Sequence, residues 1–141
     1  MSYFIATCKY EKMQENGAVK RVSEKHLCDA LSIVEADAVV TENLKPYISG
    51  DFFTSKVENS PIAEVIGHKE ADKLYLAKVA FVTIDERSGK EKKTVFQWLI
   101  GGTDFNDAYE MVLREINKCM ADIEIVSLAE TPIKEFYPAK L

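Results

Sequence analysis

Two similar stretches of the sequence carry glutamates that could do acid–base chemistry. They are SKVENSPIAEV, residues 55–65, and SLAETPIKEF, residues 127–136. Their candidate carboxylates are Glu58, Glu64, Glu130 and Glu135. Paired carboxylates can act as general acid and general base, or bind a metal ion. A small enzyme that uses the acids near Glu58 and Glu130 is therefore one hypothesis for function, and it ranks last among the three developed below.

The prolines of these stretches favour a structural interpretation. Proline cannot donate to a sheet ladder, and it fixes φ for a turn or for the start of a short helix. Ile62 and Ile133, which follow Pro61 and Pro132, would then anchor the turn to the core and leave the glutamates in solvent. A motif present once in each half of the chain is better explained by architecture than by a single active site. We therefore predict no catalytic residues here.

His26 and Cys28 form a second candidate pair, because they alternate along one face of a predicted strand. They could be two metal ligands, but no second pair stands at ligand spacing, and His68 falls in a predicted loop. Trp98 and Ile100 occupy the matching positions in the second half, as core residues would. The sequence therefore predicts no metal site and no cofactor.

The three cysteines are odd in number and widely spaced. Cys8, Cys28 and Cys119 form no CxxC motif, and no local signature pairs any of them with a histidine as a catalytic nucleophile. In an intracellular chain such cysteines are reduced and behave as small, partly buried hydrophobic residues. We expect no disulfide framework.

Gly101-Gly102 lies between a predicted strand and a predicted helix, where free backbone N–H groups could bind a phosphate. The stretch LIGGTDF lacks the GxGxxG and P-loop patterns, so this signal is weak. The matching Asp29-Ala30 in the first half shows that the turn does not require glycine.

Basic residues near two predicted hairpin turns are the candidates for contacts with nucleic acid. They are Lys20, Arg21, Lys90, Lys92 and Lys93. Two basic hairpins could straddle a phosphate backbone. Lysines near a hairpin more often stay solvated and protect strand edges, and neighbouring acids dilute the charge. Nucleic-acid binding is therefore the second hypothesis, behind protein binding.

The elements that must position these residues recur along the chain. A shift of 72 residues superimposes Gly17 on Gly89, Leu27 on Leu99 and Val40 on Val112. The same shift also matches Tyr3 with Tyr75, Ser55 with Ser127, and Glu58 with Glu130. After a gap of one residue, the Pro-Ile-x-Glu motifs coincide. We interpret the chain as an internal duplication.

Each half opens with a hairpin. The β-rich runs at 3–10 and 74–84 lead to Asn16-Gly17 and Ser88-Gly89, and return strands follow at 22–30 and 94–102. Glycine accepts the positive φ of a tight turn, and Asn-Gly is a strong hairpin signal.

One helix and a third strand complete each half. Ser32 and Asp104 are candidate helix caps, and apolar residues follow both at helical spacing. The first helix should stop near Lys45, because Pro46 disfavours helical geometry before it, and the second should run to about Met120. Further β-rich runs follow at 51–57 and 123–129.

The predicted fold is α+β, with two tandem ββαβ repeats related by pseudo-twofold symmetry and one helix on each antiparallel sheet. If the third strand lies beside the first, each sheet has the order 2-1-3. Residues 1–141 would form one compact domain, with repeat 1 at about 1–66, repeat 2 at about 74–141, and a loop at 66–73. The repeats could form two small sheets or one continuous six-stranded sheet.

The composition is that of a soluble globular protein. The 141 residues are 47% hydrophobic and 29% charged, and the net charge of −5 is spread evenly, so no basic half or tail exists to bind phosphates. The first residues do not resemble a signal peptide, and no apolar run has the length of a membrane span. We expect a cytoplasmic protein.

Four phrases together resemble one known family. They are EKHLCDALSIVEADA, LKPYISGDF, DERSGKEKKT and MADIEIVSLAETPIKEFYP. The sequence is similar over nearly its whole length to an uncharacterised domain-of-unknown-function family, number 4494, common in gut Bacteroidetes and their phages or mobile elements. The resemblance implies a small intracellular bacterial or phage-related protein, and it implies no catalytic residues.

The leading hypothesis for function is a non-enzymatic binding or assembly module. The sequence offers no constellation of nucleophile, base and orienting group, and no metal ligands at usable spacing. A compact duplicated sheet offers faces and edges to a protein partner or to a second copy of itself, as in a homodimer.

Overall fold

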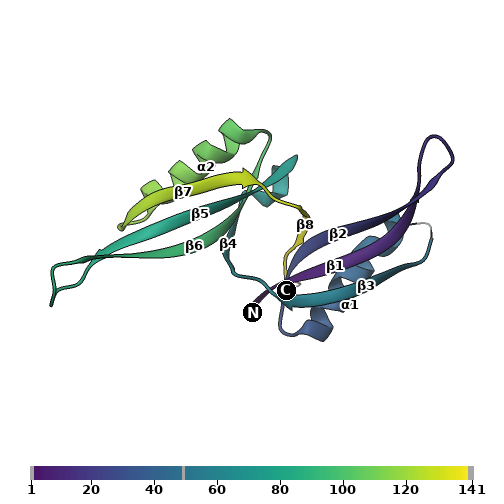
Figure 1. Cartoon of the computed structure of the whole chain (residues 1–141), viewed down its shortest axis with the longest axis horizontal. Helices are drawn as coiled ribbons and strands as arrows, with labels where there is room; N and C mark the ends of the chain where they lie inside the picture. Colours follow the sequence, from purple (N-terminus) through teal and green to yellow (C-terminus); the bar gives the residue numbers. More distant parts are fainter. Residues whose placement is uncertain (1, 49, 140–141) are drawn as a thin grey trace. The chain divides into compact units, whose positions relative to one another are not determined.

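The computed structural model describes residues 2–48 and 50–139, except for the side chain of residue 70. The chain forms two compact units (Figure 1). Unit 1 contains residues 1–60 and 132–141, and unit 2 contains residues 61–131. The fold is mixed α/β, and each unit has its own four-stranded sheet. The expectation that both halves form one compact domain stays a prediction.

Each unit is built from long strands, short strands and one α-helix. Unit 1 contains β1 (Ser2–Met13), β2 (Val19–Ala30), α1 (Ile33–Leu44), the 3-10 helix η1 (Lys45–Tyr47), β3 (Phe52–Asn59) and β8 (Ile133–Tyr137). Unit 2 contains β4 (Ile62–Ile66), the 3-10 helix η2 (His68–Glu70), β5 (Lys73–Ile84), β6 (Glu91–Gly102), α2 (Phe105–Lys118) and β7 (Asp122–Glu130).

The two sheets have the strand orders β3-β1-β2-β8 and β4-β6-β5-β7. The first three strands of each half are antiparallel neighbours in the expected order 2-1-3. The fourth strand of each sheet runs parallel to its neighbour: β8 pairs with β2, and β4 pairs with β6. Each short parallel strand therefore belongs to the sheet of the other half of the sequence.

The prediction that the Pro-Ile motif forms a turn was wrong. Pro61 and Pro132 stand directly before β4 and β8, where the missing N–H group removes no ladder hydrogen bond. Ile62 and Ile133 begin the strands, and they are buried as expected. The motif therefore starts an edge strand that leaves its own half. The predicted loop at 66–73 is correspondingly shorter, because β4 runs to Ile66 and η2 follows.

The helices form where their caps and apolar faces predict. The Ser32 hydroxyl accepts a hydrogen bond from the N–H of Glu35, and the Asp104 carboxylate accepts one from the N–H of Asp107. The helix α1 ends at Leu44, before Pro46, and α2 ends at Lys118, two residues earlier than predicted. The capping residues thus decide where both helices begin.

Each helix covers one face of its own sheet and forms a separate core. In unit 1 the core consists of Phe4, Ala6, Cys8, Cys28, Ala30, Ala36, Val40 and Leu44. In unit 2 it consists of Tyr75, Ala77, Val79, Trp98, Ile100, Ala108 and Val112. Even-numbered residues of β1 and β2 therefore face α1, and odd-numbered residues of β5 face α2.

This alternation corrects the alignment of the two halves. Ala6 pairs with His26, whereas Ala77 pairs with Trp98, so the first strands match at a shift of 71 and the second strands at 72. The difference arises in the hairpin loops, which contain residues 14–18 and 85–90. The match of Tyr3 with Tyr75 was therefore wrong by one residue. The third strands also match at a shift of 71, because Asn59 pairs with Phe4 and Glu130 pairs with Tyr75, so the matches of Ser55 with Ser127 and of Glu58 with Glu130 were wrong by one residue as well. In a strand, one residue moves a side chain to the opposite face.

Gly101 is required by the close approach of the loop after β4. A methyl group at this position would collide with the carbonyl oxygen of Gly67 and would lie 2.6 Å from Cβ of Ala71. We expect Gly101→Ala to lower the free energy of unfolding by about 2 kcal/mol in urea titrations, because the backbone must move. Gly50→Ala is the matched control, since its methyl group meets no atom within 4 Å. Equal stability of the two variants would contradict this packing.

Candidate functional site

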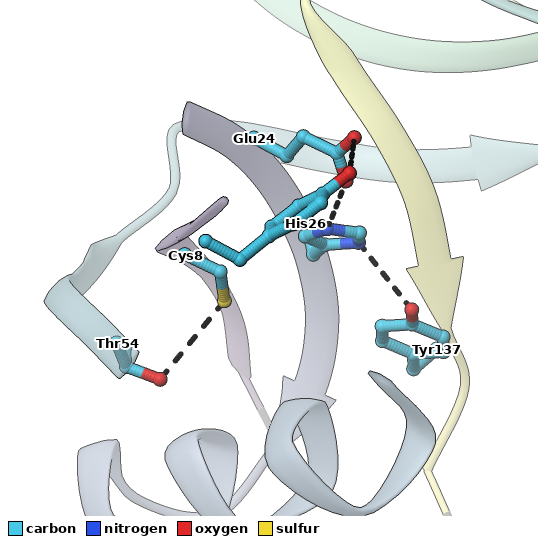
Figure 2. Close-up of polar contacts among 6 residues, drawn as sticks. Cys8, Glu24, His26, Thr54 and Tyr137 are labelled. Atoms are coloured by element: carbon cyan, nitrogen blue, oxygen red, sulfur yellow. Dashed lines mark hydrogen bonds and ion pairs between the residues drawn. The ribbon is translucent and has the colours of Figure 1, made fainter. Parts of the chain in front are cut away.

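A network of polar side chains lies on the helix face of the sheet in unit 1. Tyr10 comes from β1, Glu24 and His26 from β2, and Tyr137 from β8. The Tyr10 hydroxyl donates to Glu24 Oε1 at 2.7 Å. His26 Nε2 lies 3.3 Å from Glu24 Oε2, and the Tyr137 hydroxyl lies 3.3 Å from His26 Nδ1. Figure 2 shows the imidazole between Glu24 and Tyr137.

His26 is the buried centre of this network. Only 1% of its surface is exposed, and its ring stacks on Tyr137 with the ring centres 5.7 Å apart. Nε2 approaches Glu24 within ion-pair distance, but it lacks the geometry of a hydrogen bond. The contact is therefore a charge–dipole interaction rather than a complete hydrogen bond.

The protonation states in the network follow from burial and from the Glu24 charge. Burial lowers the pKa of His26, and the nearby Glu24 carboxylate offsets part of that effect. The hydrogen bond to Glu24 raises the pKa of Tyr10 to about 12, and burial raises the pKa of Tyr137. Both phenols therefore keep their protons at neutral pH. A neutral His26 is best protonated on Nε2, which then directs its positive end at the carboxylate, while Nδ1 accepts from Tyr137.

This chemistry is unlike that of an activated nucleophile. Nucleophilic catalysis requires a side chain whose pKa is lowered or whose proton is taken by a base. Both tyrosines are shifted in the opposite direction. The network therefore holds a negative charge and a proton in fixed places, but it does not activate an attacking group.

Unit 2 fills the matching positions with aromatic side chains. Trp98 corresponds to His26, because each pairs with an alanine of the first strand and with a glutamate of the short parallel strand. Phe81 contacts Phe96 edge-to-face at 5.1 Å between ring centres, and it contacts Trp98 at 6.4 Å. The same sheet arrangement is thus built without polar groups, so the fold itself does not require the network.

Two of the three cysteines are core residues and the third is not. Cys8 and Cys28 are fully buried, whereas Cys119 is exposed. The Cys8 thiol lies 3.9 Å from the Thr54 hydroxyl (Figure 2), and burial raises the pKa of Cys28 to about 11. These surroundings favour the unreactive thiol form. Among the residues that the structure describes, no three His, Cys, Asp or Glu side chains are placed to hold a metal ion.

The glutamates of the repeated motif do not form a site. Glu58 lies 3.2 Å from the Lys56 ammonium group, and Glu130 lies 3.8 Å from that of Lys73. The remaining two, Glu64 and Glu135, are exposed. The charge of Glu135 acts on the network, because it raises the pKa of Tyr137 after the larger effect of burial.

The Gly101-Gly102 stretch does not present free N–H groups to a phosphate. The N–H of Thr103 donates to the Asp107 carboxylate at 2.9 Å, and the N–H of Asp107 donates to Asp104 at 2.8 Å. Carboxylates of the chain therefore already occupy this helix N-terminus. The glycines are explained by packing, because a methyl group on Gly102 would lie 3.0 Å from the backbone nitrogen of Ala108.

The predicted basic residues lie on or beside two hairpin arms. Arm 1 (residues 11–21) and arm 2 (residues 83–92) are the parts of the hairpins that extend beyond the pairing with β3 and β7. Lys20 and Arg21 lie in arm 1, Lys90 and Lys92 lie in arm 2, and Lys93 follows it. Arg21 lies 3.9 Å from Glu11, and Lys93 lies 3.1 Å from Glu124. Within the described chain, the other three lysines have no ion-pair partner.

Sequence reasoning missed Tyr10, Glu24 and Tyr137. Glu24 and His26 are two residues apart on a strand, which could have indicated a shared face. Tyr137 is 111 residues from His26 in sequence, so only the pairing of β8 with β2 brings it close.

Comparison with known proteins gives one match. The model of a family described as a domain of unknown function (DUF4494) matches residues 2–139. No curated protein and no solved structure matches the chain. No helix in the described part of the chain is long and apolar enough to cross a membrane.

Proposed function

The chain belongs to the DUF4494 family, whose function is unknown, and we propose from its own residues that it is a non-enzymatic module. Its role would be protein binding and assembly. The observation that carries this proposal is the pair of exposed hairpin arms. Such a role suits a cytoplasmic protein of a bacterium or of its phages or mobile elements.

Both arms are two-stranded and open to solvent on both faces. Every residue of arm 1 and arm 2 is exposed, and Figure 1 shows both hairpins extending past the third strand of their sheets. An isolated two-stranded hairpin is only marginally stable in water. A third strand or a packed face would stabilise each arm, and a bound protein partner can supply it.

Exposed apolar side chains lie on one face of arm 1, and a single one lies on one face of arm 2. Met13 and Val19 lie directly opposite each other near the tip of arm 1, and 73% and 59% of their surfaces are exposed. Ile84 of arm 2 is 68% exposed. All three alternate with the residues that face the helices, so they lie on the other side of the ribbon. Exposed apolar groups on a protruding ribbon favour contact with an apolar surface of another protein.

The absence of an activated nucleophile in the polar network supports a non-enzymatic role. Its phenols hold their protons, and its histidine is neutral and enclosed. A binding module needs no such activation, and its partner is either a different protein or a second copy of the chain.

We expect a photo-crosslinking residue at Val19 or at Ile84 to form a covalent adduct with one protein in cells that carry the gene. The yield of the adduct should fall about fivefold when Met13 is replaced by Ser, because the few apolar contacts at the centre of an interface contribute most of the binding free energy. Mass spectrometry of the adduct identifies the partner, and sedimentation of the purified chain shows whether the partner is a second copy.

The matched control places the crosslinker at Glu110, an exposed residue of α2. An equal adduct at Glu110 and at Val19, or none at either arm, would overturn the assignment of the arms as the contact surface.

Nucleic-acid binding is the alternative, because a two-stranded ribbon fits the major groove of DNA. Arm 1 carries Lys12, Lys20 and Arg21 against Glu11 and Glu15, and arm 2 has as many acids as bases. This balance of charges weakens the attraction to phosphate groups on which nucleic-acid binding depends. Salt-dependent binding of DNA or RNA that is lost when Lys90, Lys92 and Lys93 become Glu would favour the alternative.

The two halves are best explained as copies of one ββαβ unit with pseudo-twofold symmetry. Matched pairings of the two sheets and matched caps of the two helices support this proposal. A duplicated unit would also explain why both arms carry an apolar face.

A further inference from the structure

A hollow of about 680 Å³ lies on the helix side of arm 1, next to the polar network of unit 1. Its lining includes Tyr10, Lys12, Lys20, Glu24 and Lys134. This volume falls within the range of small-molecule sites. Three strands contribute to it, because Lys12 belongs to β1, Lys20 to β2 and Lys134 to β8.

Lys12 and Lys20 are directly opposed across the ladder of arm 1. Like charges at such positions destabilise a sheet. The neighbouring pair, Glu11 opposite Arg21, has opposite charges. In the described part of the chain neither Lys12 nor Lys20 forms an ion pair with a carboxylate, so no direct partner offsets their repulsion.

Unit 2 does not repeat this pair. Thr83, two residues after Phe81, stands opposite Lys92 at the matching place. The like-charge pair therefore belongs to unit 1 alone and is not a requirement of the hairpin.

Lys134 is a third lysine that lines the same hollow. The pairing of β8 with β2 shifts between Ile133 and Glu135, which makes Lys134 the extra residue of a β-bulge. Bulges redirect a side chain. Here the bulge residue lines the hollow with the two lysines of arm 1.

The acidic residues of the lining leave positive charge in excess. The Glu24 carboxylate accepts a hydrogen bond from the Tyr10 hydroxyl and lies 3.3 Å from His26 Nε2, so it already has partners in the polar network. Glu15 is the other acid, at the turn of arm 1. We infer that the hollow binds a small molecule with two or more oxyanion groups, phosphates or carboxylates, held by the three lysines. The lysines lie on the helix side of arm 1, whereas the protein contact is proposed for the opposite side; Met13, near the tip, borders both surfaces.

The test is titration of the whole chain with pyrophosphate and with citrate, followed by backbone amide NMR shifts. We expect saturable shifts around Lys12, Lys20 and Lys134 with at least one probe. Replacement of any one of these lysines by Gln should weaken binding about tenfold, the effect of one charge-assisted hydrogen bond. Binding of citrate alone identifies a carboxylate ligand, and binding of pyrophosphate alone a phosphate ligand; either supports the site.

Lys25→Gln is the matched control, because Lys25 is an exposed lysine of β2 on the opposite face of the sheet. It should change the affinity less than twofold. Lys12→Gln should in addition raise the thermal midpoint, because it removes the repulsion from Lys20. The proposal is overturned by the lack of saturable shifts with either probe, or by an equal loss of affinity in Lys25→Gln.

Discussion

A chain that ends at Thr131 is expected to lose the folded structure of unit 1 while unit 2 keeps its own. The truncation removes β8, whose Ile133 is 7% exposed and whose Phe136 and Tyr137 are half-buried. Burial of a large apolar side chain contributes about 1.5–3 kcal/mol, so the loss is about 4 kcal/mol before any hydrogen bonds are counted. This approaches the whole stability of a small domain, about 5–15 kcal/mol.

Aromatic contacts add to the effect of losing β8. Phe136 meets Tyr3 edge-to-face at 5.9 Å between ring centres, and Tyr137 stacks on His26. Without β8, the buried His26 would face solvent and β2 would become a sheet edge. Unit 2 is expected to persist, because its sheet and helix lie wholly within residues 61–131.

Amide hydrogen exchange measures this outcome strand by strand. Protection should disappear in β1 and β2 of the truncated chain and remain in β5 and β6. A peptide of residues 132–139 should restore protection when added in excess, and a scrambled peptide should not. Undiminished protection of β2 in the truncated chain would show that β8 does not hold unit 1 together.

Local signals in the sequence predicted most of the elements but not the exchange of the short strands. Turn glycines, helix caps and apolar periodicity act within a few residues, and they placed both hairpins and both helices correctly. The pairing of β8 with β2 joins residues more than 100 positions apart, and nothing local records it. Pro61 and Pro132 predict a turn, but a proline suits the position just before an edge strand equally well, so the residue type alone does not distinguish the two.

The candidate site was predicted less well than the fold. The apolar counterpart Trp98 indicated a core position, and both His26 and Trp98 are buried. Its partners were missed because a cross-strand network requires the register of the strands, and the shift of 72 was wrong by one residue in the first strand. With the correct shift, Tyr10 corresponds to Phe81 and Glu24 to Phe96. This correspondence leads to a direct test of the network.

Transfer of the aromatic set of unit 2 into unit 1 is expected to preserve or increase stability. The variant combines Tyr10→Phe, Glu24→Phe, His26→Trp and Tyr137→Ile, the residues found at the matching places. Replacement of a buried ionic group by packed apolar side chains is often neutral or stabilising by about 1–4 kcal/mol. Urea unfolding at pH 7 measures the change.

Glu24→Phe alone should instead be destabilising by about 3 kcal/mol. It removes the acceptor of the Tyr10 hydroxyl and the carboxylate that Nε2 of the buried His26 faces, and loss of a favourable partner is costly for a buried polar group. The contrast between one replacement and four separates the network from the general effect of larger side chains. A quadruple variant that is less stable than the single one would show that unit 1 cannot adopt the packing of unit 2.

The pH dependence of the free energy of unfolding is a second way to compare the natural chain with the quadruple variant. The unfolded chain takes up a proton at His26 near pH 6.5, whereas the folded chain resists it to lower pH because burial lowers the pKa. Between these two pKa values the unfolded state binds more protons, so the free energy of unfolding falls as the pH decreases from 7 towards 5.

Glu24, Glu135 and Tyr137 surround the imidazole, and the two carboxylates limit this fall in stability by favouring the charged form of His26. The quadruple variant should lose the part of this dependence that comes from His26 and keep the part from His68, whose pKa is also lowered by burial. An unchanged slope between pH 5 and pH 7 would mean that His26 is not the titrating group, and that the network does not hold the neutral imidazole we assign to it.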